Sequence, residues 1–189
     1  MRKLASALLL AVIICVPAFG ASRAEMKRMS TFLSNFTELG MYDINADTIT
    51  DGELVHFGVW HNYVNNFKSR IRRCPDKNCP YGSLIIDEKY AAESVKKFFN
   101  INLKHTSTED EHYSGNFYHF EGADGEITYY AEVQEVSRKG SIITMRGELY
   151  SAEDDEDRPA TFTARAKPYK YGGKDTWYIL SLAVRWRYR

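Results

Sequence analysis

The segment HFGVWHNYVNN, residues 56–66, places two histidines among aromatic and amide side chains. Imidazole titrates near neutral pH and also binds metal ions, so acid–base or metal chemistry is the first question here. On a helix each residue turns about 100°, which places His56 and His61 about 140° apart around the axis. Histidines that share one metal on a helix stand four residues apart. The sequence therefore predicts no metal shared by this pair.

His56 is the catalytic candidate. It falls within the apolar stripe of the expected helix, on the side of Tyr63, whereas His61 lies outside the opposite edge. Because the stripe should face a sheet, His56 could act as a pocket acid or base. The alternative is a core histidine satisfied by one hydrogen bond. The stripe itself comprises Phe57, Trp60, Val64 and Phe67.

Two cysteines, Cys74 and Cys79, close the short segment CPDKNCP. In an exported protein a lone pair of cysteines is expected to be oxidised, and the four residues between them have turn chemistry. A disulfide over so short a loop stabilises by at most about 2–3 kcal/mol. The spacing does not match a C-x-x-C redox motif, and a zinc site would need two further ligands. We predict a structural disulfide rather than free or metal-bound thiols.

Three further histidines, His105, His112 and His119, recur at intervals of seven with acidic residues 109–111 among them. They could bind zinc, but His105 and His112 fall in an expected loop, where spacing fixes no geometry. We interpret this segment as a solvated loop. We predict neither a metal nor a cofactor.

The first residues have the layout of a cleaved secretory signal peptide. Arg2 and Lys3 precede an apolar run over residues 4–16, and small residues follow. We expect a leader over residues 1–24 and one domain over 25–189, periplasmic or extracellular. A cut after Gly20 is the alternative site. An uncleaved anchor is disfavoured because the run is shorter than the ~20 residues that a membrane span needs.

Net charge bears on the class of partner. The leader removes three of the 25 basic residues, Arg2, Lys3 and Arg23, and none of the 25 acidic ones, so the remaining chain has a formal charge of −3. Nucleic-acid binding usually requires a basic face, so this balance argues against it.

Periodicity predicts an α+β fold. Helical spacing indicates helices over about residues 25–39, over 50–67 behind a Thr50–Glu53 capping box, and after Asp87. Residues 41–50 are a linker and 83–86 a short strand. From Phe117 the period changes to two, which predicts five strands in an antiparallel meander. The apolar side of the central strands should meet the helices; it includes Ile143, Met145, Leu149, Phe162, Ala164 and Ala166.

This order, α-α-β-α-β-β-β-β-β with N-terminal helices on a curved antiparallel meander, resembles the NTF2-like (cystatin-like cone) superfamily. A cystatin-like sheet around one helix is the nearest competitor. The phrases FLSNFTELGMYDI and FYHFEGADGE resemble exported bacterial domains. The NTF2-like resemblance implies a pocket between sheet and helices, used in some members for isomerase or dehydratase chemistry and in many for binding alone.

We therefore hypothesise an exported, non-catalytic binding domain for a small ligand, envelope polymer or protein partner. It would have no transmembrane span, and homodimerisation stays open. Aromatic residues with a polar handle suit such a pocket, and the candidates are Trp60, Tyr63, Tyr118 and Tyr129. The alternative is a small NTF2-like enzyme that uses a pocket histidine, tyrosine or carboxylate. No G-x-S-x-G, H-E-x-x-H, P-loop or dinucleotide motif occurs in the sequence.

Overall fold

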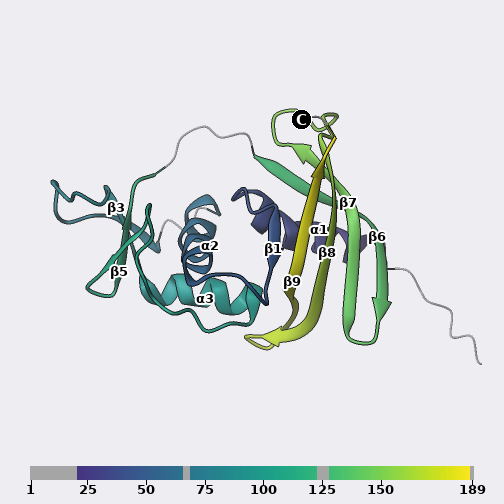
Figure 1. Ribbon diagram of the computed structural model, residues 1–189, viewed down its shortest axis with the longest axis horizontal. Coiled ribbons are helices and arrows are strands. Elements are labelled where there is room, and N and C mark those ends of the chain that lie inside the picture. The colour runs from purple at the N-terminus through teal and green to yellow at the C-terminus, as the bar shows by residue number, and fades with distance from the viewer. Residues whose placement is uncertain (1–20, 66–68, 123–127, 188–189) are drawn as a thin grey trace, which may run out of the picture.

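The computed structural model describes residues 21–65, 69–122 and 128–187 of the chain. These residues form an α+β fold with three helices and two antiparallel sheets (Figure 1). The predicted leader up to Gly20, the stripe position Phe67 and residues 123–125, where the sequence predicts a turn, lie outside the described residues. None of the described helices is both long and apolar enough to cross a bilayer.

The three predicted helices are confirmed, and each begins at a side-chain cap. Ser22 accepts a hydrogen bond from the backbone of Glu25, Thr50 and Glu53 form the predicted capping box, and Asp87 caps the third helix. The first two helices end two to three residues earlier than predicted. A cut after Gly20 would keep the Ser22 cap, whereas a cut before Glu25 would remove it. The bounds are α1 (Arg23–Thr37), α2 (Asp51–Val64) and α3 (Glu88–Phe99).

The larger sheet has the strand order β1-β9-β8-β7-β6. Four of its strands are the long predicted ones, paired as antiparallel neighbours. The fifth is short and comes from the predicted linker, where Ile44 pairs with Leu182. The bounds are β1 (Asp43–Asn45), β6 (Tyr129–Lys139), β7 (Ile142–Ser151), β8 (Ala160–Tyr171) and β9 (Lys174–Trp186).

The first strand of the predicted meander belongs to a second sheet, so the prediction of one five-strand meander is wrong. Its segment pairs with the strand before it through a tight turn, where Asn116 has a φ of 69°, and with β3. The segment pairs with the preceding strand along one edge and with β3 along the other. Because both of its edges are occupied, none is left for pairing with β6. The second sheet comprises β2 (Ile71–Arg73), β3 (Leu84–Asp87), β4 (His112–Ser114) and β5 (Phe117–Phe120).

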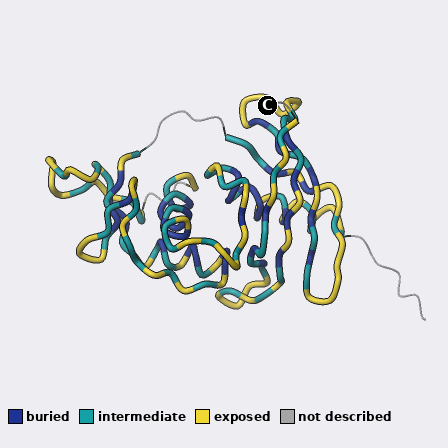
Figure 2. The backbone as a smooth tube through the Cα atoms, in the orientation of Figure 1, coloured by how far each residue is buried: buried dark blue, intermediate teal, exposed yellow. Residues whose placement is uncertain are grey.

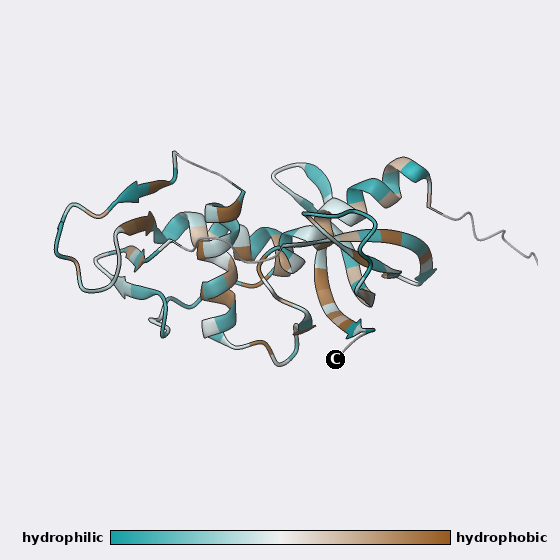
Figure 3. Cartoon of the chain, turned by 90° about the horizontal axis from the view of Figure 1, so that it is seen from above, coloured by the Kyte–Doolittle hydropathy of each residue, from teal (hydrophilic) through white to brown (hydrophobic). Residues whose placement is uncertain are grey.

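Helices α2 and α3 lie between the two sheets (Figures 1 and 3). Their buried side chains contribute to both apolar cores. Phe57 of α2 packs in the core of the large sheet, whereas Val55 and Val59 pack against the small one. A single apolar stripe on α2 was therefore a wrong expectation, and Val64 is 40% exposed. Helix α2 approaches α3 so closely that a Cβ at Gly58 would lie 2.9 Å from the Ala91 carbonyl oxygen.

The predicted apolar face of the large sheet is confirmed. Met145 is fully buried and Phe162 is 3% exposed, with the helices covering them. Figure 2 shows buried positions alternating with more exposed ones along the strands of the large sheet. Burying one face of an antiparallel sheet under helices is how such a layered domain removes apolar area from water.

Helix α1 also protects the open edge of the large sheet. Strand β6 is an edge strand, and unpaired edge groups invite association with other chains. Three hydroxyls on one side of α1 pair with these groups instead. Ser30 accepts from the Val133 N–H at 2.9 Å and Ser34 from the Ala131 N–H at 3.0 Å, while Thr37 donates to a β6 carbonyl at 2.7 Å.

Candidate functional site

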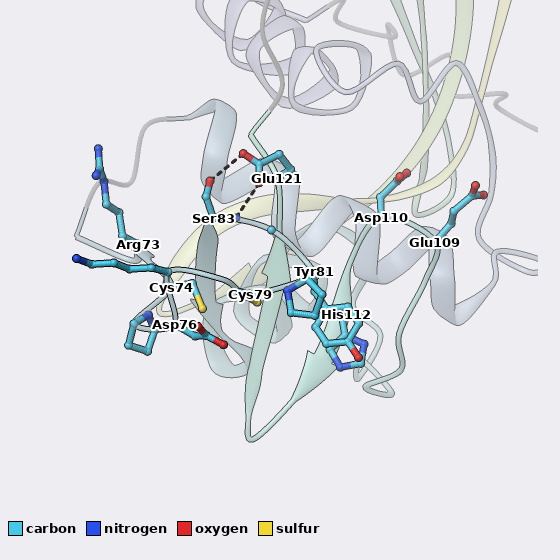
Figure 4. Close-up of a pocket in the computed structure, with 14 residues that line it drawn as sticks. Arg73, Cys74, Asp76, Cys79, Tyr81, Ser83, Glu109, Asp110, His112 and Glu121 are labelled. Atoms are coloured by element: carbon cyan, nitrogen blue, oxygen red, sulfur yellow. Dashed lines mark hydrogen bonds between the residues drawn. The ribbon is translucent and has the colours of Figure 1, made fainter.

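A cavity of about 830 Å³ lies beside the loop that joins β2 to β3 (Figure 4). The segment that leads into β4 and the end of β5 form its other walls. Figure 4 shows Arg73 at one end of the cavity and Glu109 and Asp110 at the other. A concave surface with a few convergent polar groups is the usual form of a ligand site.

An aromatic pair forms one wall of this cavity. Tyr81 is 50% exposed, and its ring stacks on that of His112 with centroids 3.5 Å apart and an interplanar angle of 12°. Because half of the Tyr81 ring is open to solvent at the cavity wall, it is accessible to another molecule. The pair presents a flat surface on which a planar group or an aliphatic chain could stack.

The backbone around Tyr81 is fixed by its neighbours. Gly82 has a φ of +127°, and a Cβ there would lie 2.2 Å from the Phe120 carbonyl, so only glycine fits. Glu121 accepts hydrogen bonds from the backbone and hydroxyl of Ser83, at 2.7 and 2.8 Å (Figure 4). The loop is thereby held against β5, and the cavity wall is formed before any ligand arrives.

Cys74 and Cys79 line the cavity as free thiols, so the predicted disulfide stays a prediction. Their sulfur atoms lie 3.6 and 3.4 Å from Nδ1 of His119. Burial, followed by the charge of His112, lowers the pKa of His119. His119 follows Cys79 by 40 positions in the sequence, and the pairing of β5 with β3 places it beside the two sulfur atoms. The sequence pattern did not reveal this neighbour, because it depends on a long-range strand pairing.

The three histidines spaced by seven do not form one group. His112 and His119 are register partners on β4 and β5, with ring centroids 6.2 Å apart. His105 faces another way, with its Nδ1 2.8 Å from the Tyr118 hydroxyl. The predicted loop contains strand β4, so the expectation of a solvated loop was wrong for His112.

His56 lies at the surface rather than against a sheet, which corrects its predicted position. Its side chain is 37% exposed, and its Nδ1 lies 3.0 Å from Oε1 of Glu111, a carboxylate that is 1% exposed. The Trp60 indole donates to the same oxygen at 2.6 Å, and the Thr108 hydroxyl donates to the other oxygen. Burial alone would raise the pKa of Glu111, but these hydrogen bonds and the charge of His56 lower it.

His61 is buried, although the helical projection placed it outside the apolar stripe. It is 4% exposed, and its ring nitrogens lie 3.0 Å from the Ser94 hydroxyl and 3.0 Å from the side-chain amide oxygen Oδ1 of Asn35. Burial first, then the charges of Lys97 and Arg70, lowers its pKa from 6.5 to about 3. The prediction was wrong because α2 packs on two sides, and polar partners from α1 and α3 make a buried imidazole tolerable.

The four aromatic candidates do not gather around the cavity. Trp60 and Tyr63 pack with the fully buried Tyr118 between α2 and the small sheet. Burial, followed by the charge of Tyr113, raises the pKa of Tyr118. Tyr129 lies in the other core, where its ring meets Trp186. The exposed aromatic pair at the cavity was not among the candidates.

Comparison with known proteins adds no relative. The chain matches no protein-family model, and neither the curated proteins nor the solved structures that were compared gave a match. The class of protein is therefore described by its geometry, as an α+β domain with two antiparallel sheets and a polar cavity beside the smaller one.

Proposed function

We propose that the protein is an exported, non-catalytic binding domain and that its ligand occupies the cavity beside β3. The observation that carries this proposal is the exposed Tyr81–His112 stack in the wall of an 830 Å³ cavity. From the sequence we expected binding on the concave face of the large sheet or at its mouth, as the NTF2-like resemblance implies. The helices fill that face with buried side chains, which favours the cavity at the small sheet instead.

The charges around the cavity indicate the chemistry of its ligand. Arg73 and Lys77 supply positive charge, and Asp76, Glu109, Asp110 and Glu121 supply negative charge. Arg73 lies at the end away from Glu109 and Asp110, and the Glu121 carboxylate is engaged by Ser83 (Figure 4). A ligand with an anionic group at one end, a cationic group at the other and a planar segment between them would match. A peptide segment of an envelope polymer or of a protein partner has this pattern.

The test is a titration of the ¹⁵N-labelled protein with short zwitterionic peptides and with fragments of envelope polymer. Amide shifts should concentrate in residues 73–83 and 109–112. Tyr81→Ala should weaken the interaction by about two- to tenfold, since stacking of this kind contributes about 0.5–1.5 kcal/mol. Tyr130→Ala, on the large sheet, is the matched control and should bind as the parent does. Shifts confined to the large sheet would contradict the proposal.

Export and family are part of the same proposal. The leader supports export, and mass spectrometry of periplasmic protein should find a chain that starts at Ala21 or Glu25. We also propose the NTF2-like superfamily for the fold. Support comes from a large sheet whose inner face packs on α1 and α3. A full-length chain retained in the cytoplasm would contradict the export proposal.

A second candidate is an enzyme based on His56. Its Nδ1 meets a buried carboxylate while the ring stays partly exposed. In catalytic dyads such a carboxylate fixes the tautomer of the base. His56 is not among the lining residues of the cavities described, which places this candidate second. A panel of isomerase and dehydratase substrates tests it: turnover should disappear in His56→Ala and persist in Tyr81→Ala.

A further inference from the structure

We propose that Cys74, Cys79 and His119 form a binding site for a thiophilic divalent metal ion, with Zn²⁺ as the ion that suits them best. Their ligand atoms all lie within 4.8 Å of one another. Two come from the loop between β2 and β3, Cys74 at its start and Cys79 in its middle, and the third comes from β5. The site does not depend on the proposed peptide-like ligand, because a metal ion alone tests it.

The distances match a tetrahedral zinc centre. Zn–S bonds of about 2.3 Å and a Zn–N bond of about 2.0–2.1 Å, at the tetrahedral angle, separate sulfur from nitrogen by roughly 3.5–3.6 Å. The two sulfur-to-Nδ1 distances are 3.6 and 3.4 Å. A disulfide would join the sulfurs to each other and would leave their shared approach to His119 unexplained.

Hydrogen bonding accounts for only part of this arrangement. A neutral imidazole Nδ1 carries either one proton or one lone pair, so a well-directed hydrogen bond can join it to one sulfur. Both sulfurs lie at nearly the same distance from it. A metal ion between the three atoms satisfies both contacts at once.

The ligands are held in place by backbone hydrogen bonds that need no metal. The Cys74 N–H donates to the Ser83 carbonyl at 2.8 Å, which continues the pairing of β2 with β3. The Asp76 carbonyl accepts from the Cys79 N–H at 3.2 Å, and the Asp76 carboxylate accepts from the Asn78 N–H at 2.9 Å. His119 is fixed by its register opposite Ile85. Such preorganisation lowers the entropy cost of binding.

Chemistry narrows the choice of metal. Thiolate and imidazole ligands select zinc-like or softer ions over Mg²⁺ and Ca²⁺, and the C-x4-C spacing lies within the range of zinc sites. Two thiolates and a neutral imidazole cancel the charge of a divalent ion. Three protein ligands leave a fourth position for water or a ligand atom. Because Cys74 and Cys79 line the cavity, this position would open toward it.

The first experiment titrates the chain carrying Cys15→Ser, reduced with a phosphine and then freed of reductant, with Co²⁺ and afterwards Zn²⁺. Cys74 and Cys79 are then its only cysteines. We expect one cobalt per chain, thiolate-to-cobalt absorption, the visible bands of tetrahedral cobalt, and displacement by zinc. Cys74→Ser, Cys79→Ser and His119→Gln should each weaken binding by more than about 100-fold, since even outer-shell changes cost about 10–100-fold.

The control variant is His105→Gln, which alters a histidine that faces the Tyr118 hydroxyl instead of the cavity and should retain metal affinity within a few fold. Circular dichroism checks that each variant folds; if His119→Gln does not, the two cysteine variants carry the test. Failure of the reduced parent to bind cobalt, or undiminished binding by the ligand variants, overturns the proposal. The peptide titration of the metal-free protein is unaffected by that result, so the two proposals fail separately.

A second experiment separates the metal from the disulfide, which would use the same sulfur atoms. The exported protein is treated with an alkylating reagent after a chelator alone or after a reductant. Thiols protected by metal become reactive with the chelator alone, and this is the expected result. Thiols that react only after reduction are joined in a disulfide, and that result overturns the metal site in the exported protein.

Discussion

The indole Nε1 of Trp60 lies 2.6 Å from Oε1 of Glu111, and this contact fastens helix α2 to the segment before β4. The carboxylate is almost completely buried and also accepts hydrogen bonds from His56 and Thr108. A buried charge is tolerable only when hydrogen bonds replace its water. The same contact positions residues 109 and 110 at the cavity.

Glu111→Ala is expected to destabilise the protein by about 2–4 kcal/mol, because it leaves the partly buried Trp60 N–H without its acceptor and removes a paired, buried carboxylate. His56→Ala should cost less, since that ring is already partly exposed to water. Urea denaturation measures both changes. Glu109→Ala, in the same segment and exposed, should stay within about 0.5 kcal/mol of the parent. Equal losses for Glu109 and Glu111 would contradict a specific role for Glu111.

Stability should fall as pH is lowered from 6.5 to 5, and His61 should cause much of the loss. Its pKa is about 3 in the folded protein, against 6.5 ordinarily, so in this range the unfolded chain binds a proton that the folded protein does not. The expected loss is about 2 kcal/mol at pH 5. His61→Gln should show a flatter profile in urea denaturation across this range. A profile as steep as the parent's would contradict the assignment.

Below this range Glu111 should add to the loss in the same direction. Its pKa is lowered in the folded protein, so the unfolded chain is protonated first as pH falls below 4.5. The stabilisation from its ionised form is present above that pH and disappears below it. The measurement is the pH dependence of the unfolding midpoint in Glu111→Gln, which should lose this acid-range component and keep the one due to His61.

Gly147→Ala should destabilise by about 2–4 kcal/mol, because a Cβ there would lie 1.9 Å from the Glu132 carbonyl oxygen across the sheet. The clash falls where the register of β6 and β7 shifts between Val133 and Glu135. Thermal unfolding measures the effect. The control is Gly140→Ala, at a turn with nothing within 4 Å and a φ of +58°, which should cost only about 1 kcal/mol.

Ser34→Ala should cost about 1–3 kcal/mol, because its hydroxyl oxygen is the acceptor for the buried N–H of Ala131 on the edge strand. The Ala131 amide should also exchange with deuterium faster than in the parent. Thr31→Ala lies on the exposed side of the same helix and serves as the control. An unchanged exchange rate at Ala131 would show that α1 does not protect the sheet edge.

Local signals were sufficient for the helices and the long strands. The Thr50–Glu53 capping box, the Asp87 cap and the alternation through Met145 and Phe162 all act over a few residues, and all are confirmed. The same signals predicted which face of the large sheet is apolar. They did not reveal the second sheet, because strand-length segments do not specify which distant partner completes their pairing.

The sequence by itself determined the elements of this protein and the chemistry of its side chains, because capping, propensity and periodicity act between near neighbours. Only the tertiary structure decided that His61 is buried and His56 is not, and that His119 reaches the two cysteines. Those outcomes depend on α2 packing on two sheets and on β5 pairing with β3. Contacts between residues 40 or more positions apart follow from how whole elements share one core, which no short stretch of sequence contains.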